Sequence, residues 1–105
     1  MRYTLDMSPL LRMDALTWDN WNLEHIKKHD VTVGEILDVL DSVVDGQASY
    51  KGRYRVIGVT RQGRVLTIVV GRNPSHPTIW YVFSAHPASR KERAYFQQQL
   101  GSETL

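Results

Sequence analysis

The chain of 105 residues is the length of one domain, and its 42% hydrophobic and 23% charged residues exclude a wholly disordered protein. It contains no cysteine, which excludes disulfides, thiol nucleophiles and thiolate metal sites. The net charge of +2 divides into −5 over residues 1–50, +8 over 51–93 and −1 over the remainder, so the basic segment indicates either a polyanion partner or a solubilising surface.

Residues 1–13 show no hydrophobic period, and we interpret them as a loosely ordered N-terminal arm. Charged residues interrupt the apolar run that a signal peptide needs, and no apolar run approaches the ~20 residues of a membrane span. We therefore expect a cytoplasmic protein without membrane contact, with a single domain over 14–100 and a tail over 101–105. Ala15–Trp18 is a candidate short strand.

Two helices are expected next. Asp19 is a candidate N-cap for a first helix that runs to about His29. Thr32 and Glu35 form the T-x-x-E pattern of a capping box, which predicts the start of a second helix. Apolar residues in this helix recur at i, i+3, i+4 and i+7 and predict one buried stripe, and Gly46 is a candidate helix end. The stripe consists of Val33, Ile36, Leu37, Leu40 and Val44.

Three strands are expected after the second helix, over Tyr50–Val59, Val65–Val70 and Thr78–Ala85. Arg61–Arg64 is predicted to be a turn that needs a positive φ at Gly63. The β-branched run of the second strand predicts burial on both faces. In the third strand, alternation divides the large side chains between two faces. One face has Ile79, Tyr81 and Phe83, and the other has Trp80 and Val82.

Ser89 and Glu92 form a second capping box, which predicts a last helix that runs to about Leu100 and ends at Gly101. The expected fold class is α+β, with two N-terminal helices, a three- or four-stranded antiparallel sheet and a C-terminal helix. We expect the helices to lie on one face of the sheet.

The motifs that identify many enzymes are missing from this sequence. No glycine-rich phosphate loop precedes a helix, and no G-x-S-x-G nucleophile motif is present. His25 and His29 stand at i, i+4 on the first helix, where they could bind a metal. A zincin pattern, however, needs Glu directly after the first histidine and a third ligand, whereas Glu24 precedes His25. We therefore expect no metal and no cofactor.

A basic and aromatic surface is what the sequence offers instead. Trp80 and Tyr81 can stack on unpaired bases, although a core role competes for Trp80. Arg53 and Arg55 share one side of a strand at i, i+2, so we expect the basic residues of 51–93 to converge on one face. Metal-free RNA cleavage needs a base for the 2′-OH proton, an acid for the leaving 5′-oxygen, and cations that stabilise the phosphorane. The available cations are Arg53, Arg55, Arg61, Arg64, Arg72, Arg90, Lys91 and Arg93.

Two blocks of the sequence carry a family resemblance. The first is WDNWNLEHIKKHDV at 18–31 followed by Glu35, and the second runs from YRVIG at 54–58 through Gly63-Arg64 to SAHPASRKERAY at 84–95. Together they resemble the BrnT family, whose members typically have W-D-x-x-K/N…K-H-G-V…E, then a strand ending in I-G, a G-R-L turn, and R-I-I-S-A-R-x-A/M-T-x-x-E-R-x-x-Y. The match covers about Trp18 to Tyr95 and rests on the order and spacing of all the pieces.

The resemblance implies a RelE-like fold and the ribonuclease toxin of a type II toxin–antitoxin system, which cleaves RNA without a metal and inhibits translation. It also implies a neutralising BrnA-like or other DNA-binding antitoxin encoded nearby, and contact with operator DNA only through that antitoxin. Two alternatives come from other classes of protein. One is a catalytically weak relative that binds a partner or RNA without cutting, and the other is a stand-alone basic adaptor.

Three positions depart from the family pattern. Asp30 replaces the Gly of K-H-G-V, Tyr81 replaces an Arg on the last strand, and His86 replaces the Arg after S-A. The two lost arginines lie where we expect catalysis, and His86 can supply an acid or base in place of a cation. We assign catalysis to His86, Arg64, Tyr81 and Glu92. We assign RNA contacts to Lys28, His29, Arg53, Arg55, Arg61, Arg90 and Arg93.

Structural roles compete with these assignments. The capping box already explains Glu92, and a rigid connection before a proline explains His86. A turn offers Arg64 no structural partner that the sequence shows, which favours a functional role for it. Core or surface packing likewise competes with RNA contact at Trp18, Lys28 and His29.

Overall fold

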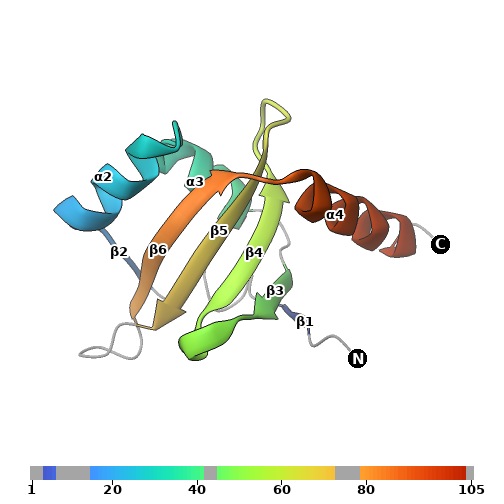
Figure 1. The fold of residues 1–105 in the computed structure, drawn as a ribbon, viewed down its shortest axis with the longest axis horizontal. Coiled ribbons are helices and arrows are strands. Elements are labelled where there is room, and N and C mark those ends of the chain that lie inside the picture. The colour runs from blue at the N-terminus through green and yellow to red at the C-terminus, as the bar shows by residue number, and fades with distance from the viewer. Residues whose placement is uncertain (1–3, 7–14, 42–44, 73–78, 104–105) are drawn as a thin grey trace.

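The computed structural model describes residues 4–6, 15–41, 45–72 and 79–103, and Figure 1 labels its helices and strands. In chain order these are β1 (Thr4–Asp6), β2 (Ala15–Thr17), α2 (Asn20–Lys28), α3 (Val33–Asp41), β3 (Asp45–Ala48), the 3-10 turn η1 (Tyr50–Gly52), β4 (Tyr54–Val59), β5 (Val65–Arg72), β6 (Ile79–Pro87) and α4 (Arg90–Glu103). Among the described helices, none is long and apolar enough to cross a membrane.

In the described part of the chain, six strands form one sheet in the order β1-β3-β4-β5-β6-β2. All neighbouring strands are antiparallel except β2 and β6, which are parallel. The expected α+β class and the order of helices and central strands are confirmed, as is the short strand β2. The sheet is larger than the three or four antiparallel strands expected, because β1, β2 and β3 have only three or four residues, too few for an alternating pattern. β1 lies inside the segment interpreted as a loose arm, whose other residues are outside the described part.

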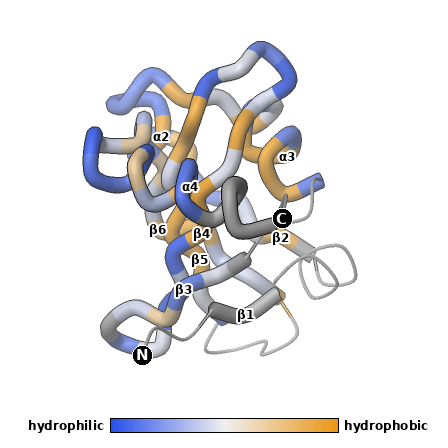
Figure 2. The backbone as a smooth tube through the Cα atoms, turned by 90° about the vertical axis from the view of Figure 1, so that its right-hand side faces the viewer, coloured by the Kyte–Doolittle hydropathy of each residue, from blue (hydrophilic) through white to orange (hydrophobic). Residues whose placement is uncertain are grey.

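Helices α2 and α3 cover one face of the sheet, and the hydrophobic core lies between them and the central strands (Figures 1 and 2). The core consists of Ile26, Val31, Ile36, Val39, Leu40, Val56, Leu66, Ile68, Val70, Trp80, Val82 and Ala85. Trp80 is 1% exposed, which confirms the core role over base stacking. Trp18 packs partly buried against the same core.

The last helix does not lie on the same face as the other two, contrary to expectation. Residues of α4 line a pocket with Arg55 and Ile57 of β4, and these two side chains lie on the sheet face opposite the core. We call this face the open face, and define it by Arg55, Ser84 and His86 on β4 and β6. Because α4 covers it only at the end near β4, the half-buried side chains of β6 remain accessible from this side.

Local sequence signals set the beginnings of all three helices. Asp19 caps α2 by accepting a hydrogen bond from the Asn22 backbone at 2.9 Å. Thr32 and Glu35 form the expected capping box before α3, with distances of 3.0 and 3.1 Å between their side chains and backbone amides. The capping box at the start of α4 is also confirmed, although α4 continues through Gly101 to Glu103 instead of ending there.

The end of α2 adopts a Schellman motif with a left-handed residue. Asp30 has a φ of +58°, its amide donates to Lys27 O at 3.0 Å, and the Val31 amide donates to Ile26 O at 3.1 Å. The side chains of Val31 and Ile26 are both buried, which supplies the hydrophobic contact of the motif. Asp30 thus occupies a position that favours glycine, since most side chains are strained there.

The buried stripe of α3 is rotated from the one expected. Ile36, Val39 and Leu40 are buried, whereas Leu37 is 48% exposed. The helix packs only one narrow side against β4 and β5. Successive helical residues are turned by about 100°, so Leu37 lies outside this side and is exposed. Val44 lies outside the described residues.

Three strand boundaries differ from those expected, one of them the end of β5, which lies at Arg72 instead of Val70. The segment expected as one strand over 50–59 begins with η1, where Lys51 has a φ of +59°, and only then enters β4. The turn before β5 has the expected positive φ at Gly63, +88°. β6 runs to Pro87, two residues beyond its expected end, so His86 lies in a strand and not in a loop. This paired backbone gives His86 a defined direction.

Candidate functional site

The centre of the candidate site is a contact between a histidine at the end of β6 and a glutamate in the first turn of α4, which is an ion pair whenever the histidine is protonated. His86 pairs with Thr67 of β5 in the sheet, and its Nε2 lies 3.4 Å from Glu92 Oε1. Ala85 is fully buried on the core side, so strand alternation places its neighbours Ser84 and His86 on the open face. Two of the four residues assigned to catalysis from the sequence, His86 and Glu92, therefore meet at this point.

Glu92 performs its capping role and contacts the site at the same time. Its Oε1 accepts a hydrogen bond from the Ser89 amide at 2.8 Å, while its Oε2 lies 3.8 Å from Arg55 Nη1. Burial raises the pKa of Glu92, but the Ser89 amide and the charge of His86 outweigh it, and the pKa falls below its usual range. Glu92 is therefore a carboxylate at neutral pH, able to orient the His86 ring through Nε2.

A buried hydroxyl lies under this ion pair. Thr67 is 0% exposed, and its backbone is the strand neighbour of both Ile57 and His86. Its Oγ1 lies close enough to Glu92 to help lower the pKa of that carboxyl, but its geometry falls short of a full hydrogen bond. A buried polar group, the Thr67 hydroxyl, therefore lies beneath the site, at a position that the sequence analysis placed in a strand buried on both faces.

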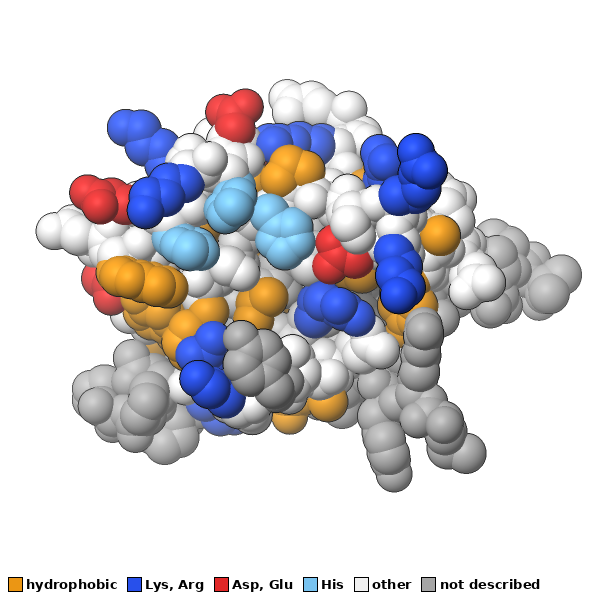
Figure 3. All heavy atoms as spheres, in the orientation of Figure 1, with side chains coloured by type: hydrophobic (Ala, Val, Ile, Leu, Met, Phe, Trp, Pro, Cys, Tyr) orange, Lys and Arg blue, Asp and Glu red, His pale blue; other side chains and the backbone are white. Residues whose placement is uncertain are grey.

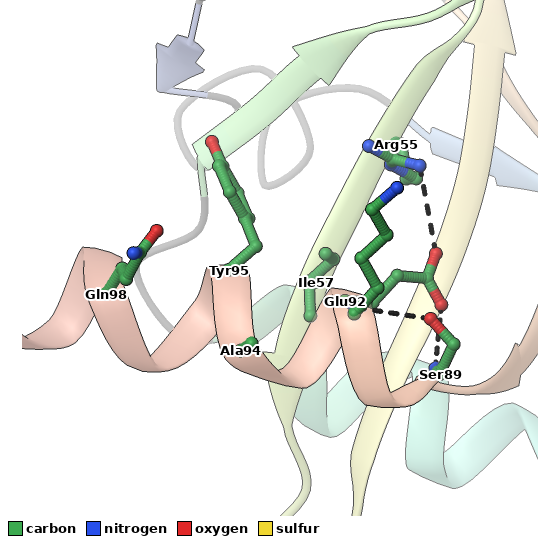
Figure 4. A pocket seen from close by; sticks show the side chains of 8 residues that line it. Arg55, Ile57, Ser89, Glu92, Ala94, Tyr95 and Gln98 are labelled. Atoms are coloured by element: carbon green, nitrogen blue, oxygen red, sulfur yellow. Dashed lines mark hydrogen bonds and ion pairs between the residues drawn. The ribbon is translucent and has the colours of Figure 1, made fainter.

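Arg55 connects the ion pair to a pocket between β4 and α4 (Figure 4). Figure 4 shows the side chains of Arg55 and Glu92 directed toward one another, with Ser89 beside Glu92. The guanidinium also donates to Gln47 Oε1 at 2.6 Å, which holds it over the open face. The pocket has a volume of about 570 Å³. Its lining residues are Arg55, Ile57, Ser89, Lys91, Glu92, Ala94, Tyr95 and Gln98.

A second imidazole lies next to the ion pair. His29, the C-cap residue of α2, has its ring centroid 6.1 Å from that of His86 and 5.6 Å from that of His25. Figure 3 shows histidine side chains gathered on this face of the molecule, with lysines and arginines around them. Two imidazole rings, one carboxylate and one arginine therefore share a small accessible area.

Arg64 is held elsewhere, by partners that sequence reasoning did not find. Its Nη1 donates to Asp30 O at 2.6 Å and to the carboxylate of Glu35 at 2.9 and 3.0 Å. Burial raises the pKa of Glu35, but the hydrogen bond from Arg64 outweighs it and the pKa is lowered. The inference that Arg64 lacks a structural partner was wrong, because its partners stand 29 and 34 residues away in the chain.

The basic residues of 51–93 do not all converge on one face. Arg53 and Arg55 lie toward the open face as expected, and the Arg53 guanidinium is 3.7 Å from the centroid of the Phe83 ring. Arg61, 79% exposed at the β4–β5 turn, instead contacts Asp38 at 3.5 Å on α3. The expectation of a single basic face therefore holds only in part. Arg90 and Arg93 in the first turn of α4 and Lys28 at the end of α2 are exposed.

Tyr81 lies far from the ion pair. It is five residues before His86 on β6, a separation of about 16 Å along an extended strand. Its hydroxyl donates to both carboxylate oxygens of Asp19, each at 2.9 Å. Burial, this hydrogen bond and the charge of Asp19 raise the pKa of Tyr81 to about 12. Tyr81 therefore connects β6 to the start of α2, and it cannot act on the same phosphate as His86.

Sequence reasoning missed Thr67 and Gln47. Thr67 stands in a β-branched run that looks like an ordinary buried strand, and Gln47 stands in β3, which is too short to show an alternating pattern. Among the described residues there is no group of three side chains that could hold a metal ion. Comparison with family models, curated proteins and solved structures found no match to this chain.

Proposed function

We propose that this chain is a cytoplasmic ribonuclease toxin of the BrnT type, and that its catalytic centre is the ion pair of His86 and Glu92 on the open face. The observation that carries the proposal is the 3.4 Å separation of His86 Nε2 from Glu92 Oε1, with His29 and Arg55 beside them. These residues supply each chemical role that RNA cleavage by the 2′-OH requires.

In the proposed reaction, the 2′-oxygen attacks the adjacent phosphorus and the bond from phosphorus to the 5′-oxygen breaks. His86 takes the proton of the 2′-OH, since Glu92 holds its Nε2 and leaves Nδ1 for proton exchange. His29 protonates the leaving 5′-oxygen, and Arg55 stabilises the charge on the phosphorane. The products are a 2′,3′-cyclic phosphate and a 5′-hydroxyl.

The family assignment gains support from the end of α2. The resemblance places the glycine of K-H-G-V at Asp30, and Asp30 has the left-handed φ that glycine favours. A backbone conformation suited to the family residue thus persists where the residue itself has changed. On this basis we propose the partners of the family as well, namely an RNA substrate and a DNA-binding antitoxin that covers the open face. Operator DNA is contacted through that antitoxin.

The test is cleavage of a single-stranded RNA by the purified protein and its His86→Ala variant. We expect the variant to be slower by about 10²-fold or more, because a general base is lost. Leu37→Ala is the matched control, because Leu37 is 48% exposed on α3, which covers the sheet face opposite the open face. Equal rates for parent and His86→Ala would refute the assignment. Expression of the parent should also arrest growth, and expression of His86→Ala should not.

One observation favours the alternative of a weakly catalytic binder. Tyr81 replaces a family arginine, and Asp19 holds its hydroxyl in the neutral form with a pKa of about 12. If that arginine is indispensable, the chain binds RNA without cutting it. Measurement of RNA binding together with cleavage separates the two functions, because the alternative predicts binding that His86→Ala leaves unchanged and no cleavage by the parent.

A further inference from the structure

The exposed side of α2 carries a row of aromatic rings. Trp21 is 55% exposed, and its ring is stacked on that of His25 with centroids 4.9 Å apart and planes 7° from parallel. His29 continues the row, with its ring 5.6 Å from His25. These three residues stand at i, i+4 and i+8, so one side of the helix presents all of them. We call them the α2 ring row.

The ring row leads directly to the ion pair. Its last member, His29, has its ring 6.1 Å from that of His86. At the other end the Trp21 ring lies 6.2 Å from Tyr81, which also faces accessible surface on β6. A continuous line of aromatic rings, stacked between Trp21 and His25 and edge to face from His25 onward, therefore connects the proposed catalytic histidine with an exposed indole on the neighbouring helix.

Helix stability alone does not account for this arrangement. The buried side of α2 is formed by Asn22 and Ile26, so the ring row is not part of the core. Stacking of two side chains at i, i+4 stabilises a helix much less than burial of an indole stabilises a protein. Trp21 is largely unburied, so it gains little of that second contribution. An accessible tryptophan beside histidines and cations is instead the arrangement that binds unpaired bases.

We propose that the α2 ring row binds the bases of a single-stranded RNA whose scissile phosphate lies at His86. This inference rests on the proposed function and adds the path of the substrate. Bases in a duplex are stacked on one another and cannot reach the rings, so the row selects unpaired RNA. Lys28, exposed three residues after His25 and so on the same side of the helix, neutralises a phosphate of the strand.

The experiment measures binding by fluorescence anisotropy with a labelled ten-nucleotide RNA that carries 2′-O-methyl groups, which prevent attack by the 2′-oxygen. Trp21→Ala should weaken binding about 5- to 150-fold, the range for loss of one stacked base, whereas Trp21→Phe should retain most of the affinity. Leu37→Ala is the matched control, because Leu37 is an apolar residue on α3 with a similar exposure, 48% against 55% for Trp21. The parent should bind a duplex of the same strand far more weakly.

Salt dependence separates stacking from charge. We expect Trp21→Ala to leave the slope of log affinity against log salt unchanged, and Lys28→Ala to reduce its magnitude by about 0.7. Thermal melting confirms that Trp21→Ala and Leu37→Ala are equally folded.

The outcomes distinguish this inference from the proposed function. If the parent cuts RNA but Trp21→Ala binds the probe as tightly as the parent, the ring row is not the substrate path and the function stands. If Trp21 is required for binding but the parent cuts no unmodified RNA, the path stands and the catalytic proposal is wrong. Equal affinity for duplex and single strand would overturn the inference, as would a failure of the parent to bind the probe.

Discussion

Arg64 Nη1 lies 2.6 Å from the carbonyl oxygen of Asp30, so the start of β5 holds the left-handed residue that follows α2. The same guanidinium nitrogen contacts the carboxylate of Glu35 in the first turn of α3. One side chain thus ties the connection between the two helices to the β4–β5 hairpin, which explains why this arginine stands beside a turn.

Arg64→Ala should lower the free energy of unfolding by about 1–2 kcal/mol, because a charge-assisted hydrogen bond is lost at a partly exposed site. Arg64→Lys should recover only part of the lost free energy of unfolding, since the lysine ammonium lacks the planar set of donors that a guanidinium has. Urea unfolding measures both, with Arg61→Ala as the control for an exposed pair. If Arg64→Ala is as stable as Arg61→Ala, the structural role is wrong and a role in RNA binding regains support.

Asp30→Gly should raise the free energy of unfolding by about 0.5–1 kcal/mol, because glycine adopts the φ of +58° without strain. The contact with Arg64 uses the backbone carbonyl and is retained. Asp30→Val should have the opposite effect, since a β-branched residue is disfavoured in this conformation. Thermal melting of the two variants tests this, and a lower melting temperature for Asp30→Gly would contradict it.

The pKa of about 12 for Tyr81 predicts a distinct step in an ultraviolet titration. Tyr81 should ionise well above the ordinary value of 10, and Tyr81→Phe should remove that step. Because the folded pKa lies above the ordinary value of 10, the stabilisation from the neutral hydroxyl is complete below pH 10 and is lost as the pH rises through about 12. A titration of Tyr81→Phe that matches the parent would show that Asp19 does not hold this hydroxyl.

The lowered pKa of Glu92 predicts an acid-dependent loss of stability. A carboxylate whose folded pKa is depressed stabilises the protein above its ordinary value of 4.5, and this contribution disappears as the pH falls through the folded pKa. Glu92→Gln should therefore be less stable than the parent at pH 7 by about 0.5–1 kcal/mol, allowing for screening by solvent. The difference between the two should shrink as the pH falls through the folded pKa of Glu92. A difference that is constant from pH 7 to pH 3 is incompatible with this charge effect.

The parts of the fold that depend on neighbouring residues could be predicted from the sequence, and the parts that depend on distant ones could not. The caps at Asp19, Thr32 and Ser89 were predicted because each bonds a residue three positions away. His86 was identified but placed in a loop, because the extension of β6 to Pro87 depends on pairing with β5. A register shift between Val69 and Val70 also changes the alternation along β6, and no pattern in β6 itself reveals it.

The candidate site shows the same division. Glu92 was assigned from its motif, but its proximity to His86 depends on the angle at which α4 leaves the sheet. The short distance between the His29 and His86 rings depends on the packing of α2 against β6. In the chain, α3 and the strands β3, β4 and β5 stand between these two elements. Arg64 was misjudged because its partners lie across such a separation, and Trp21 was not assigned because an apolar residue near the start of a helix usually belongs to the core.

The central claim is that His86 and Glu92 act as one unit, and the most direct measurement is a double-mutant cycle in RNA cleavage rate. Glu92→Gln keeps the hydrogen-bonding shape of the capping box and removes only the charge, so His86→Ala, Glu92→Gln and the double variant can be compared at matched folding. Groups that act as a unit are not additive, so the double variant should cleave no more slowly than His86→Ala, itself about 10²-fold or more below the parent. A parent that cleaves RNA no faster than His86→Ala, or losses that multiply in the double variant, would contradict the account.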